Sequence, residues 1–443
     1  MTKTQLIAMA FAVMATGVWA AGEQKTGKGQ QIPLGVNEYD FLVYKPSQVF
    51  DARQYGDITK RGDSYNDHFQ VIWDEKRGLL YAFWTQASWE GAPDSHICFA
   101  TSADKGKTWT YPVLLAGSET RQYPRPEAYY QQPMLAKTGR LYCLWTERHT
   151  PQGMVGTYSD DAGKTWTPTK VMGVRRSDQD PANPRVCPNY INWQRPLRLG
   201  KDGRFFVASS HHGKAPYDAK EACKINFWEF LNIDENPEVN AIRLDYFAWD
   251  RQALGVEKLP KGENLFVPKF YPNRNPPVPE GPAVEEAAIV KLPDGRLFAL
   301  MRSSVGSPVW SQSKDGGRTW SGLKVLVDAN GKPFPHPRSP CPIYDRGGDT
   351  AASGEYFAFI HNTFDYKSQT ACQPRPQLYL IAGTFDPTGD QPIKFKAPKL
   401  FLKRTFGNSL YSSYTVIDGQ GILWFPDVKY YLLGRKIDAK WFD

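Results

Sequence analysis

The sequence predicts an all-β protein, a six-bladed β-propeller made of four-stranded antiparallel blades. Three observations support this prediction: the composition, a glycine-marked hairpin that recurs six times, and a turn motif that recurs three times. The chain has 443 residues, of which 37 are Gly and 35 are Pro, and 14% are aromatic. Many turn-forming residues together with many aromatic residues favour short strands over long helices.

The recurring hairpin consists of two apolar runs separated by a tight turn with glycine. In one copy, the apolar residues 288–290 precede Gly295 and the apolar residues 297–300 follow it. Because such a turn needs a positive φ between two strands, each copy predicts a β-hairpin. The turn glycines are 61, 64, 92, 59 and 67 residues apart, and they are Gly78, Gly139, Gly203, Gly295, Gly354 and Gly421. A hairpin that recurs about every 60 residues is typical of a propeller blade.

The spacing of the repeats also predicts how the ring closes and where it is interrupted. Only 22 residues follow Gly421, which is too few for a whole blade. We therefore expect a strand from about residues 38–50 to complete the last blade, which would remove the free edges of the sheets. The long interval after Gly203 predicts an insertion in the third blade at about residues 211–280. Residues 21–443 would then form a single domain.

The recurring turn motif has the pattern S-x-D-x-G-x-T-W and occupies residues 102–109, 159–166 and 313–320. We expect the Asp and Ser side chains to bond turn amides, the Gly to be left-handed and the Trp to pack between strands. The motif is identified as the Asp box of sialidase-like (BNR) propellers, and the resemblance covers nearly everything after about residue 60. It is a structural staple, and blades 3, 5 and 6 lack a good copy.

Hairpin geometry predicts which residues share one end of the hub. The first strand of each blade descends to the glycine and the second returns, so the Asp boxes should lie at the lower end. Residues about ten before and seven after each glycine should ring the upper end. They are His68, Tyr129, Trp193, Glu285, Tyr344 and Tyr411, and Thr85, Thr146, Ser210, Arg302 and His361. Polar groups that converge on one axis indicate a binding site.

Two segments at this upper end resemble the catalytic segments of sialidases. Residues 284–302 are similar to the segment that carries the catalytic Glu and a carboxylate-binding Arg, which implies Glu286, or its neighbour Glu285, and Arg302. Residues 410–419 resemble the segment with the nucleophilic Tyr, which implies Tyr411.

Two further residues follow from the same resemblance. Arg375 resembles another carboxylate-binding Arg of the family, and residues 90–94 resemble the loop that holds the acid/base Asp, which implies Asp94. The family's first Arg, however, is replaced here by His68. This replacement indicates either a relative that acts on another acidic sugar or a sialidase with altered carboxylate recognition.

The residue types suit the chemistry of an acidic sugar. A sialic acid has a carboxylate on its reacting carbon, which would repel a carboxylate nucleophile. A neutral Tyr that a neighbouring Glu deprotonates avoids this repulsion. Arginines bind the substrate carboxylate with paired hydrogen bonds, and Asp94 would protonate the leaving oxygen and then activate water. The resemblance thus implies an exo-acting glycosidase that releases a terminal acidic sugar from a glycan, with no cofactor or metal.

Two other functions stay open on the sequence. A uronate-polysaccharide lyase on the same scaffold would use His68, His96, Tyr411 and Arg302, with His68 and His96 near the substrate. A non-catalytic glycan-binding propeller is the third reading, against which the Glu and Tyr pair argues. Asp94 as a loop cap and both histidines as structural residues are the alternatives to their functional roles.

The N-terminus predicts export. A short basic start, an apolar stretch up to Trp19 and small residues predict that residues 1–20 are a cleaved signal peptide, so the protein would be secreted or periplasmic. Disulfides are then permissible. Similar placements beside the upper loops predict the disulfides Cys187–Cys223 and Cys341–Cys372, whereas Cys98 and Cys143 lie in apolar runs and should be buried thiols.

Composition and motifs exclude several other classes. The net charge of +8 is modest and no Lys/Arg block is present, so we expect no nucleic-acid partner. No long apolar run follows the first 20 residues, so we expect no membrane span. The histidines lack metal-ligand spacing, and no phosphate-binding glycine loop is present. The expected partner is an acidic oligosaccharide or glycoconjugate, bound by a monomer.

Overall fold

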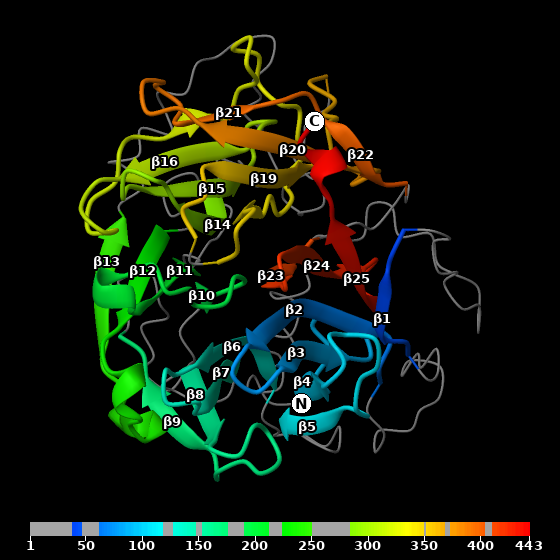
Figure 1. The fold of residues 1–443 in the computed structure, drawn as a ribbon, viewed down its shortest axis with the longest axis vertical. Coiled ribbons are helices and arrows are strands. Elements are labelled where there is room, and N and C mark those ends of the chain that lie inside the picture. Colours follow the sequence, from blue (N-terminus) through cyan, green and yellow to red (C-terminus); the bar gives the residue numbers. More distant parts are fainter. Residues whose placement is uncertain are drawn as a thin grey trace, which may run out of the picture.

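The computed structural model describes residues 38–46, 62–117, 127–147, 153–175, 190–211, 224–249, 284–349, 351–367, 373–403 and 410–443. Six antiparallel sheets surround a central hub, as Figure 1 shows, so the predicted six-bladed propeller is confirmed. Within the described residues, the other regular elements are 3₁₀ turns at Lys201–Gly203, Ile233–Glu235, Val239–Ala241 and Ala439–Trp441.

Blades 1 to 3 each contain four strands that run outward from the hub in chain order. Blade 1 consists of β2 (Tyr65–Asp74), β3 (Leu79–Ala87), β4 (His96–Ser102) and β5 (Val113–Ala116). Blade 2 consists of β6 (Ala128–Leu135), β7 (Leu141–Glu147), β8 (Gly153–Ser159) and β9 (Lys170–Gly173). Blade 3 consists of β10 (Tyr190–Ile191), β11 (Phe205–His211), β12 (Lys224–Phe230) and β13 (Leu244–Trp249).

Blades 4 to 6 follow the same plan with two modifications. Blade 4 consists of β14 (Val284–Lys291), β15 (Leu297–Ser303), β16 (Val309–Ser313) and β17 (Lys324–Val325). Blade 5 contains β18 (Ile343–Asp345), β19 (Glu355–Ile360), β20 (Leu378–Phe385) and β21 (Ile393–Phe395), and a fifth strand, β22 (Lys399–Leu402), pairs with β20. Blade 6 combines β23 (Ser413–Ile417), β24 (Gln420–Asp427) and β25 (Tyr431–Ile437) with β1 (Phe41–Tyr44).

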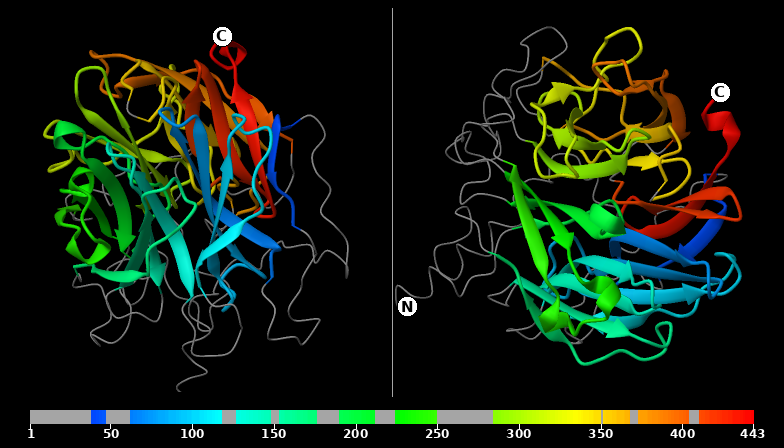
Figure 2. Two further views of the ribbon diagram at one scale, coloured as in Figure 1. Left: turned by 60° about the horizontal axis from the view of Figure 1, so that its bottom comes forward. Right: turned by 60° about the vertical axis from the view of Figure 1, so that its left-hand side comes forward.

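The pairing of β1 with β25 closes the ring. Phe41 lies opposite Gly434 and Leu42 opposite Leu433, in antiparallel register. Figure 2 shows β1, in blue, beside the red strands of the C-terminal blade. The prediction that an N-terminal strand completes the last blade is therefore confirmed, with a strand shorter than expected.

The hydrophobic core lies in the seams between neighbouring blades. One cluster joins Phe69 and Trp84 of blade 1 to Ile422 and Trp424 of blade 6. Another joins blade 1 to blade 2 through residues such as Phe99 and Leu141. Because each blade buries its faces against both neighbours, the ring is a continuous core around the hub.

Each Asp box forms the predicted turn. In blade 1, the Gly106 amide donates to Ser102 Oγ at 2.9 Å, and the Thr108 amide donates to Asp104 Oδ1 at 2.9 Å. Trp109 Nε1 donates to the Gly106 carbonyl at 3.1 Å. The boxes around Asp161 and Asp315 repeat the Ser and Thr bonds.

The boxes also attach each blade to the preceding blade. The box glycines have φ of +91°, +84° and +93°, and each lies against an aromatic ring of the neighbouring blade. A Cβ on the glycine would lie 2.7, 2.4 and 2.4 Å from that ring in the pairs Gly106–Trp424, Gly163–Phe99 and Gly317–Phe206. Glycine is thus required both by the left-handed backbone and by the close approach.

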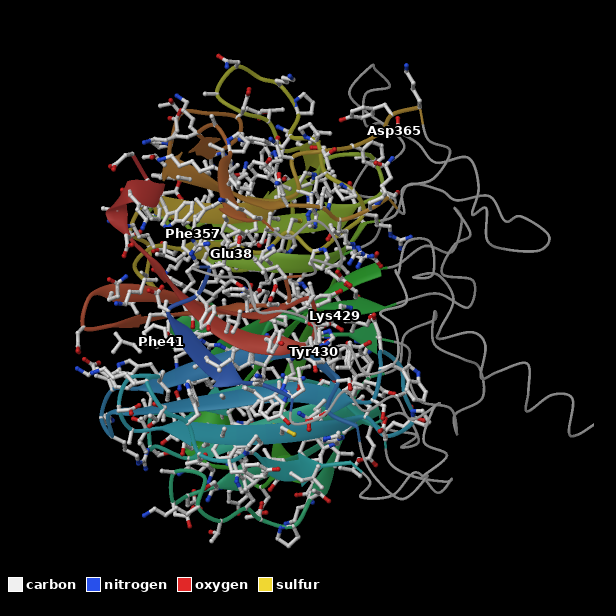
Figure 3. All side chains as sticks on the ribbon, turned by 90° about the vertical axis from the view of Figure 1, so that its right-hand side faces the viewer. Glu38, Phe41, Phe357, Asp365, Lys429 and Tyr430 are labelled. Atoms are coloured by element: carbon white, nitrogen blue, oxygen red, sulfur yellow. The ribbon has the colours of Figure 1, made fainter. Side chains whose placement is uncertain are left out.

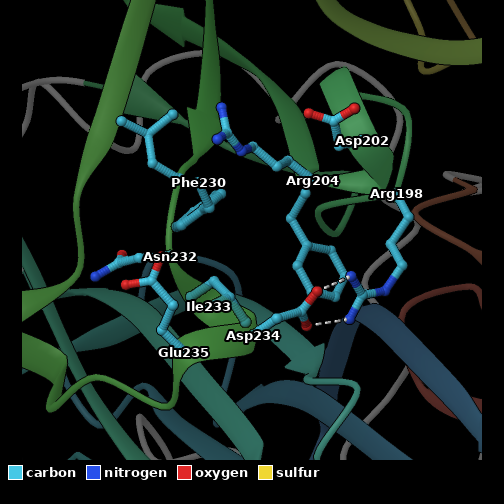
Figure 4. A pocket seen from close by; sticks show the side chains of 10 residues that line it. Arg198, Asp202, Arg204, Phe230, Asn232, Ile233, Asp234 and Glu235 are labelled. Atoms are coloured by element: carbon cyan, nitrogen blue, oxygen red, sulfur yellow. Dashed lines mark hydrogen bonds and ion pairs between the residues drawn. The ribbon is translucent and has the colours of Figure 1, made fainter.

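Blade 3 lacks an Asp box, and a different contact occupies that place. The segment after β12 carries Asp234, whose carboxylate accepts two hydrogen bonds from the Arg198 guanidinium at 2.8 and 3.0 Å and one from the Lys137 amide of blade 2. Figure 4 shows this pair in a hollow of about 200 Å³ that Phe205 and Phe230 also line. Because Arg198 and Asp234 are paired with each other, we interpret this contact as a structural link in the place of an Asp box.

The inner strands of blades 1, 2 and 4 share a bulge near the upper end. One extra residue interrupts the pairing in each strand: His68 in β2, Tyr130 in β6 and Glu286 in β14. Their φ values are 53°, 55° and 55°. Positive φ is disfavoured for such residues and marks functional sites more often than ordinary strands.

Groups from the preceding blade hold these bulges in place. The Tyr130 amide donates to Thr85 Oγ1 at 3.2 Å, and the Glu286 amide donates to Ser210 Oγ at 2.7 Å. After His68, the Phe69 amide donates to the Tyr411 carbonyl at 2.9 Å. Hydrogen bonds between neighbouring blades therefore fix the backbone of these bulges.

Several predictions concern residues outside this description. The predicted signal peptide at residues 1–20 lies outside the described residues, as do most of the insertion at 211–280 and Cys187, Cys223 and Cys372. Cys98 and Cys143 are buried free thiols, as predicted. Cys341 is also a buried free thiol, packed in an apolar cluster, so the structure does not form the predicted Cys341–Cys372 disulfide. No helix among the described residues is long and apolar enough to cross a bilayer.

Candidate active site

Three residues from two blades meet at the centre of the upper end. Glu286 comes from the bulge of β14, Arg302 from the upper end of β15, and Tyr411 precedes β23. The Tyr411 hydroxyl donates to Glu286 Oε1 at 2.7 Å. Arg302 Nη1 lies 3.0 and 2.9 Å from the two oxygens of Glu286 and 3.5 Å from the Tyr411 hydroxyl. The predicted nucleophile, its base and an arginine are therefore in direct contact.

A second layer of charge holds Arg302 in place. Arg302 Nε lies 3.2 Å from Glu285 Oε1, and the same oxygen accepts from Arg338 at 2.8 Å. Arg375 Nη2 donates to the Arg338 carbonyl at 3.0 Å. Glu285 thus orients two guanidinium groups, while Glu286 remains the carboxylate that contacts the phenol.

Burial and charge shift the pKa values of these groups. Burial, and then the carboxylate of Glu286, raises the pKa of Tyr411, so the phenol is protonated in the free protein. Burial alone would lower the pKa of Arg302, but the carboxylates of Glu286 and Glu285 outweigh it and raise the pKa. Burial and the neighbouring Arg302 lower the pKa of Arg375 to about 9, which indicates a cation that an incoming anion would stabilise.

His68 forms an aromatic wall beside Tyr411. Its ring stacks on the Tyr411 ring with a centroid distance of 4.4 Å and meets the edge of Tyr130 at 4.6 Å. Burial, and then the charge of Lys429, lowers the pKa of His68 to about 3, so the imidazole is neutral. Its buried Nδ1 has no hydrogen-bond partner among the described residues. His68 therefore lies beside Tyr411 as a neutral ring, and its role in binding substrate stays a prediction.

A lysine adds a further cation to the cluster of side chains around Tyr411, Glu286 and Arg302. Lys429, in the turn between β24 and β25, lies 3.2 Å from Asp67 Oδ2 and 2.7 Å from Glu90 Oε1. Its Nζ lies 5.7 Å from the centre of the Tyr411 ring. Burial raises the pKa of Asp67 to about 6, although Lys429 opposes this shift. Figure 3 shows Lys429 well away from Phe41 and Phe357, which lie toward the other end of the blades.

Asp94 and His96 are not part of this cluster. The Asp94 carboxylate accepts hydrogen bonds from the Gly62 amide at 2.9 Å and from the amide and hydroxyl of Ser88. His96 Nδ1 lies 2.7 Å from the Asp94 carbonyl, and its Nε2 lies 3.1 Å from Gln86 Oε1. Both side chains are buried and organise the loop and blade, which corresponds to the structural alternatives for these two residues.

The sequence reasoning missed Arg338, Lys429, Glu90 and Tyr130. Tyr130 is one residue from the predicted Tyr129, within the error of the spacing, because the bulge shifts the register. Lys429 lies eight residues after Gly421, so the same spacing rule applied to the last blade would have found it. Arg338 precedes the short strand β18, where the spacing rule does not reach.

The arrangement suits proton transfer and anion binding. No group of three or more His, Cys, Asp or Glu side chains in the described part of the chain is placed to hold a metal ion. The cluster instead combines a phenol, carboxylates and guanidinium groups, which together can take up a proton and bind an anion.

Sequence comparison assigns the family. A profile of the BNR repeat-like domain matches residues 78–419, which is most of the chain. The chain belongs to the BNR repeat-like family. A search of functionally curated proteins finds no match to this BNR repeat-like protein.

Solved structures of similar shape include three glycan-active proteins. A variant of the NanB sialidase from Streptococcus pneumoniae shares 12% identity at a TM-score of 0.60, over 93% of this chain and 72% of its own. The intramolecular trans-sialidase from Ruminococcus gnavus shares 14% identity at a TM-score of 0.55, over 89% of this chain and 98% of its own. An α-L-arabinanase from Penicillium chrysogenum shares 13% identity at a TM-score of 0.51, over 91% of this chain and 98% of its own. At such low identities, these matches show a shared fold.

Proposed function

We propose that this BNR repeat-like protein is a glycoside hydrolase that releases a terminal acidic sugar, sialic acid or a similar sugar, from a glycan. The observation that carries the proposal is the 2.7 Å hydrogen bond from the Tyr411 hydroxyl to Glu286 beside Arg302. A phenol paired with a carboxylate base is the arrangement that a tyrosine nucleophile requires. The sialidases among the structures of similar fold support the same reaction class.

The proposed reaction has two halves. In the first, Glu286 accepts the phenol proton as Tyr411 Oη attacks the anomeric carbon, and the glycosidic C–O bond breaks as its oxygen accepts a proton. In the second, water attacks the same carbon and gives one proton to the group that protonated the leaving oxygen, the bond to Tyr411 breaks, and the phenolate recovers its proton from Glu286. The anomeric configuration is retained because the carbon is inverted twice.

An acidic substrate is supported by the cations around Tyr411. Arg302 and Arg375 would bind the sugar carboxylate, and the lowered pKa of Arg375 favours an anion beside it. Glu286, Glu285 and His68 would contact or orient the same part of the sugar. His68 is neutral and adds no charge, and Arg338 is bound to Glu285, so Arg302 and Arg375 would supply the charged contacts to the sugar carboxylate.

A uronate-polysaccharide lyase is the second candidate. The observation that favours it is the position of His68, a neutral ring whose Nδ1 has no hydrogen-bond partner among the described residues, stacked on a tyrosine. A neutral imidazole can accept a proton, and Tyr411 could return one to the leaving oxygen. In the two candidates, Tyr411 therefore acts either as a nucleophile or as an acid.

Product analysis tests the proposal. The protein is incubated with sialyllactose and, separately, with uronate-containing polysaccharides. Free sialic acid supports the hydrolase, ultraviolet-absorbing unsaturated uronate supports the lyase, and glycan binding without either product indicates a binding protein.

The Tyr411→Phe variant tests the nucleophile. Because it removes the attacking oxygen, we expect release of the sugar to fall at least ~100-fold. The Tyr129→Phe variant removes a buried phenol from β6 of blade 2 and is the matched control. Unchanged turnover by Tyr411→Phe would reject the assignment of the nucleophile.

A further inference from the structure

The proposed reaction needs a proton donor that reaches the leaving oxygen, and most carboxylates of the cluster are committed elsewhere. Glu286 accepts from Tyr411, and Glu285 is held between Arg302 and Arg338. Asp67 has an exposed fraction of 0%. Each of these three carboxylates is therefore already paired or fully buried.

Among the described carboxylates of the cluster, Glu90 is the one that is exposed to solvent. It follows β3 in a turn closed by a hydrogen bond from the Ala92 amide to the Trp89 carbonyl, and the next residue, Gly91, has φ of 74°. Its side chain is 45% exposed, and Oε1 lies 2.7 Å from Lys429 Nζ. The same ammonium lies 5.7 Å from the centre of the Tyr411 ring. Glu90 is therefore exposed to solvent, and its partner Lys429 places it near Tyr411.

Asp94, in the same loop, points the other way. Its carboxylate accepts from the Gly62 amide and from Ser88, and its exposed fraction is 1%. The loop thus carries one carboxylate that organises the chain and another that faces the cluster. The sequence alone does not distinguish their roles.

We propose that Glu90 is the general acid and base of the reaction, and that Lys429, anchored by Asp67, is the positioning residue that holds it above Tyr411. This inference rests on the proposed hydrolase function. Glu90 donates its proton to the glycosidic oxygen as that C–O bond breaks. In the second half, its carboxylate accepts a proton from the water that attacks the anomeric carbon.

The charges around Glu90 predict the sign of a pH effect. The groups that face it are Lys429, Asp67 and His68 and, from the segment before β20, Arg375. The partial loss of hydration of the half-exposed Glu90 side chain would raise its pKa, but the charge of Lys429 outweighs this effect and lowers the pKa. The protonated form that the first half needs is therefore populated at acidic pH, and we expect turnover of sugar leaving groups to rise as pH falls.

The experiment compares two leaving groups with the Glu90→Gln variant. An aryl sialoside has a leaving group that needs little protonation, whereas sialyllactose needs a full proton transfer. We expect the variant to lose at least ~100-fold in kcat/KM on sialyllactose and less than about tenfold on the aryl sialoside. The matched control is Asp94→Asn, for which we expect a lower melting temperature and equal losses on both substrates.

Two further measurements separate a catalytic role from a structural one. Azide should restore turnover of the aryl sialoside by Glu90→Ala and yield the glycosyl azide, because azide attacks the Tyr411-linked sugar without a base. Lys429→Gln should raise the pKa of Glu90, and so move the alkaline limb of the kcat/KM profile, where activity falls as pH rises, upward by about 1 pH unit. Equal losses of Glu90→Gln on both substrates, or no azide product, would overturn the role of Glu90. A wild-type protein that hydrolyses neither substrate would instead overturn the proposed function.

Discussion

At the scale of single residues, the feature that most shapes the site is buried charge. Four cations, Arg302, Arg338, Arg375 and Lys429, lie among the four carboxylates Glu285, Glu286, Asp67 and Glu90. Each cation contacts a carboxylate or a carbonyl of the cluster. Breaking one such pair leaves an uncompensated buried charge, so substitutions here affect stability as well as activity.

The raised pKa of Asp67 predicts how the free energy of unfolding changes with pH. Its pKa is raised by burial to about 6 in the folded protein, against 3.8 for an exposed group. The folded state therefore binds the proton more tightly, and the stability from Asp67 is present below about pH 4 and lost as pH rises through 6. Relative to Asp67→Asn, the wild type should lose about 3 kcal/mol of unfolding free energy between pH 4 and 7.5.

Urea unfolding at several pH values measures this difference. The Asp74→Asn variant, which changes a carboxylate of the same strand near the lower end, controls for general acid effects. A wild-type advantage over Asp67→Asn that grows with pH would show that the carboxylate is stabilised by Lys429 more than it is destabilised by burial.

At the scale of elements, the Asp boxes connect each blade to the one before it. Their glycines meet aromatic rings of the neighbouring blade, and their Asp carboxylates bond the amides of the turn. Blade 3 uses the Arg198–Asp234 pair at the same place, and in blade 5 Asp386 accepts from the Thr388 amide and hydroxyl. A carboxylate in the turn after the third strand therefore occurs in more blades of this ring than the Asp-box sequence motif does.

Gly163→Ala tests the contact between box and neighbouring blade. The added methyl group would meet the Phe99 ring at 2.4 Å in a left-handed backbone, so we expect a loss of roughly 2–4 kcal/mol. Gly295→Ala has a similar φ of +88° with nothing within 4 Å of the new Cβ, and should show the backbone cost of only about 1 kcal/mol. Equal losses for the two variants would argue against the seam contact.

At the scale of the whole molecule, closure by β1 holds the ring together. Removal of residues up to 46 would expose the edge of β25, which pairs with β1 along Phe41 and Leu42. We expect such a truncated chain to melt at a lower temperature than the chain that begins at residue 21 and to associate as its concentration rises. Thermal unfolding and size-exclusion chromatography report both effects. A truncated chain that stays monomeric with an unchanged melting temperature would show that the blade does not need β1.

The sequence predicted the ring well because its signals are local. The turn glycines and Asp boxes each depend on a few neighbouring residues, so the number of blades and the end of the hub that carries Tyr411, Glu286 and Arg302 could be derived. The orientation of the Glu90–Asp94 loop could not, because two carboxylates four residues apart compete and the fold of the turn decides. Cys341 was misjudged for a similar reason, since its packing against other blades depends on tertiary structure.

The partnership of β1 with β25 also has a consequence for the order of events in synthesis. Residue 41 must find residue 434, so nearly the entire chain has to emerge before this pairing can form. Contacts so distant along the chain form slowly, because a large loop must close first. The first of the described strands to be synthesised is therefore the last to be placed, and a helper protein that shields β1 during that wait would raise the yield of folded molecules.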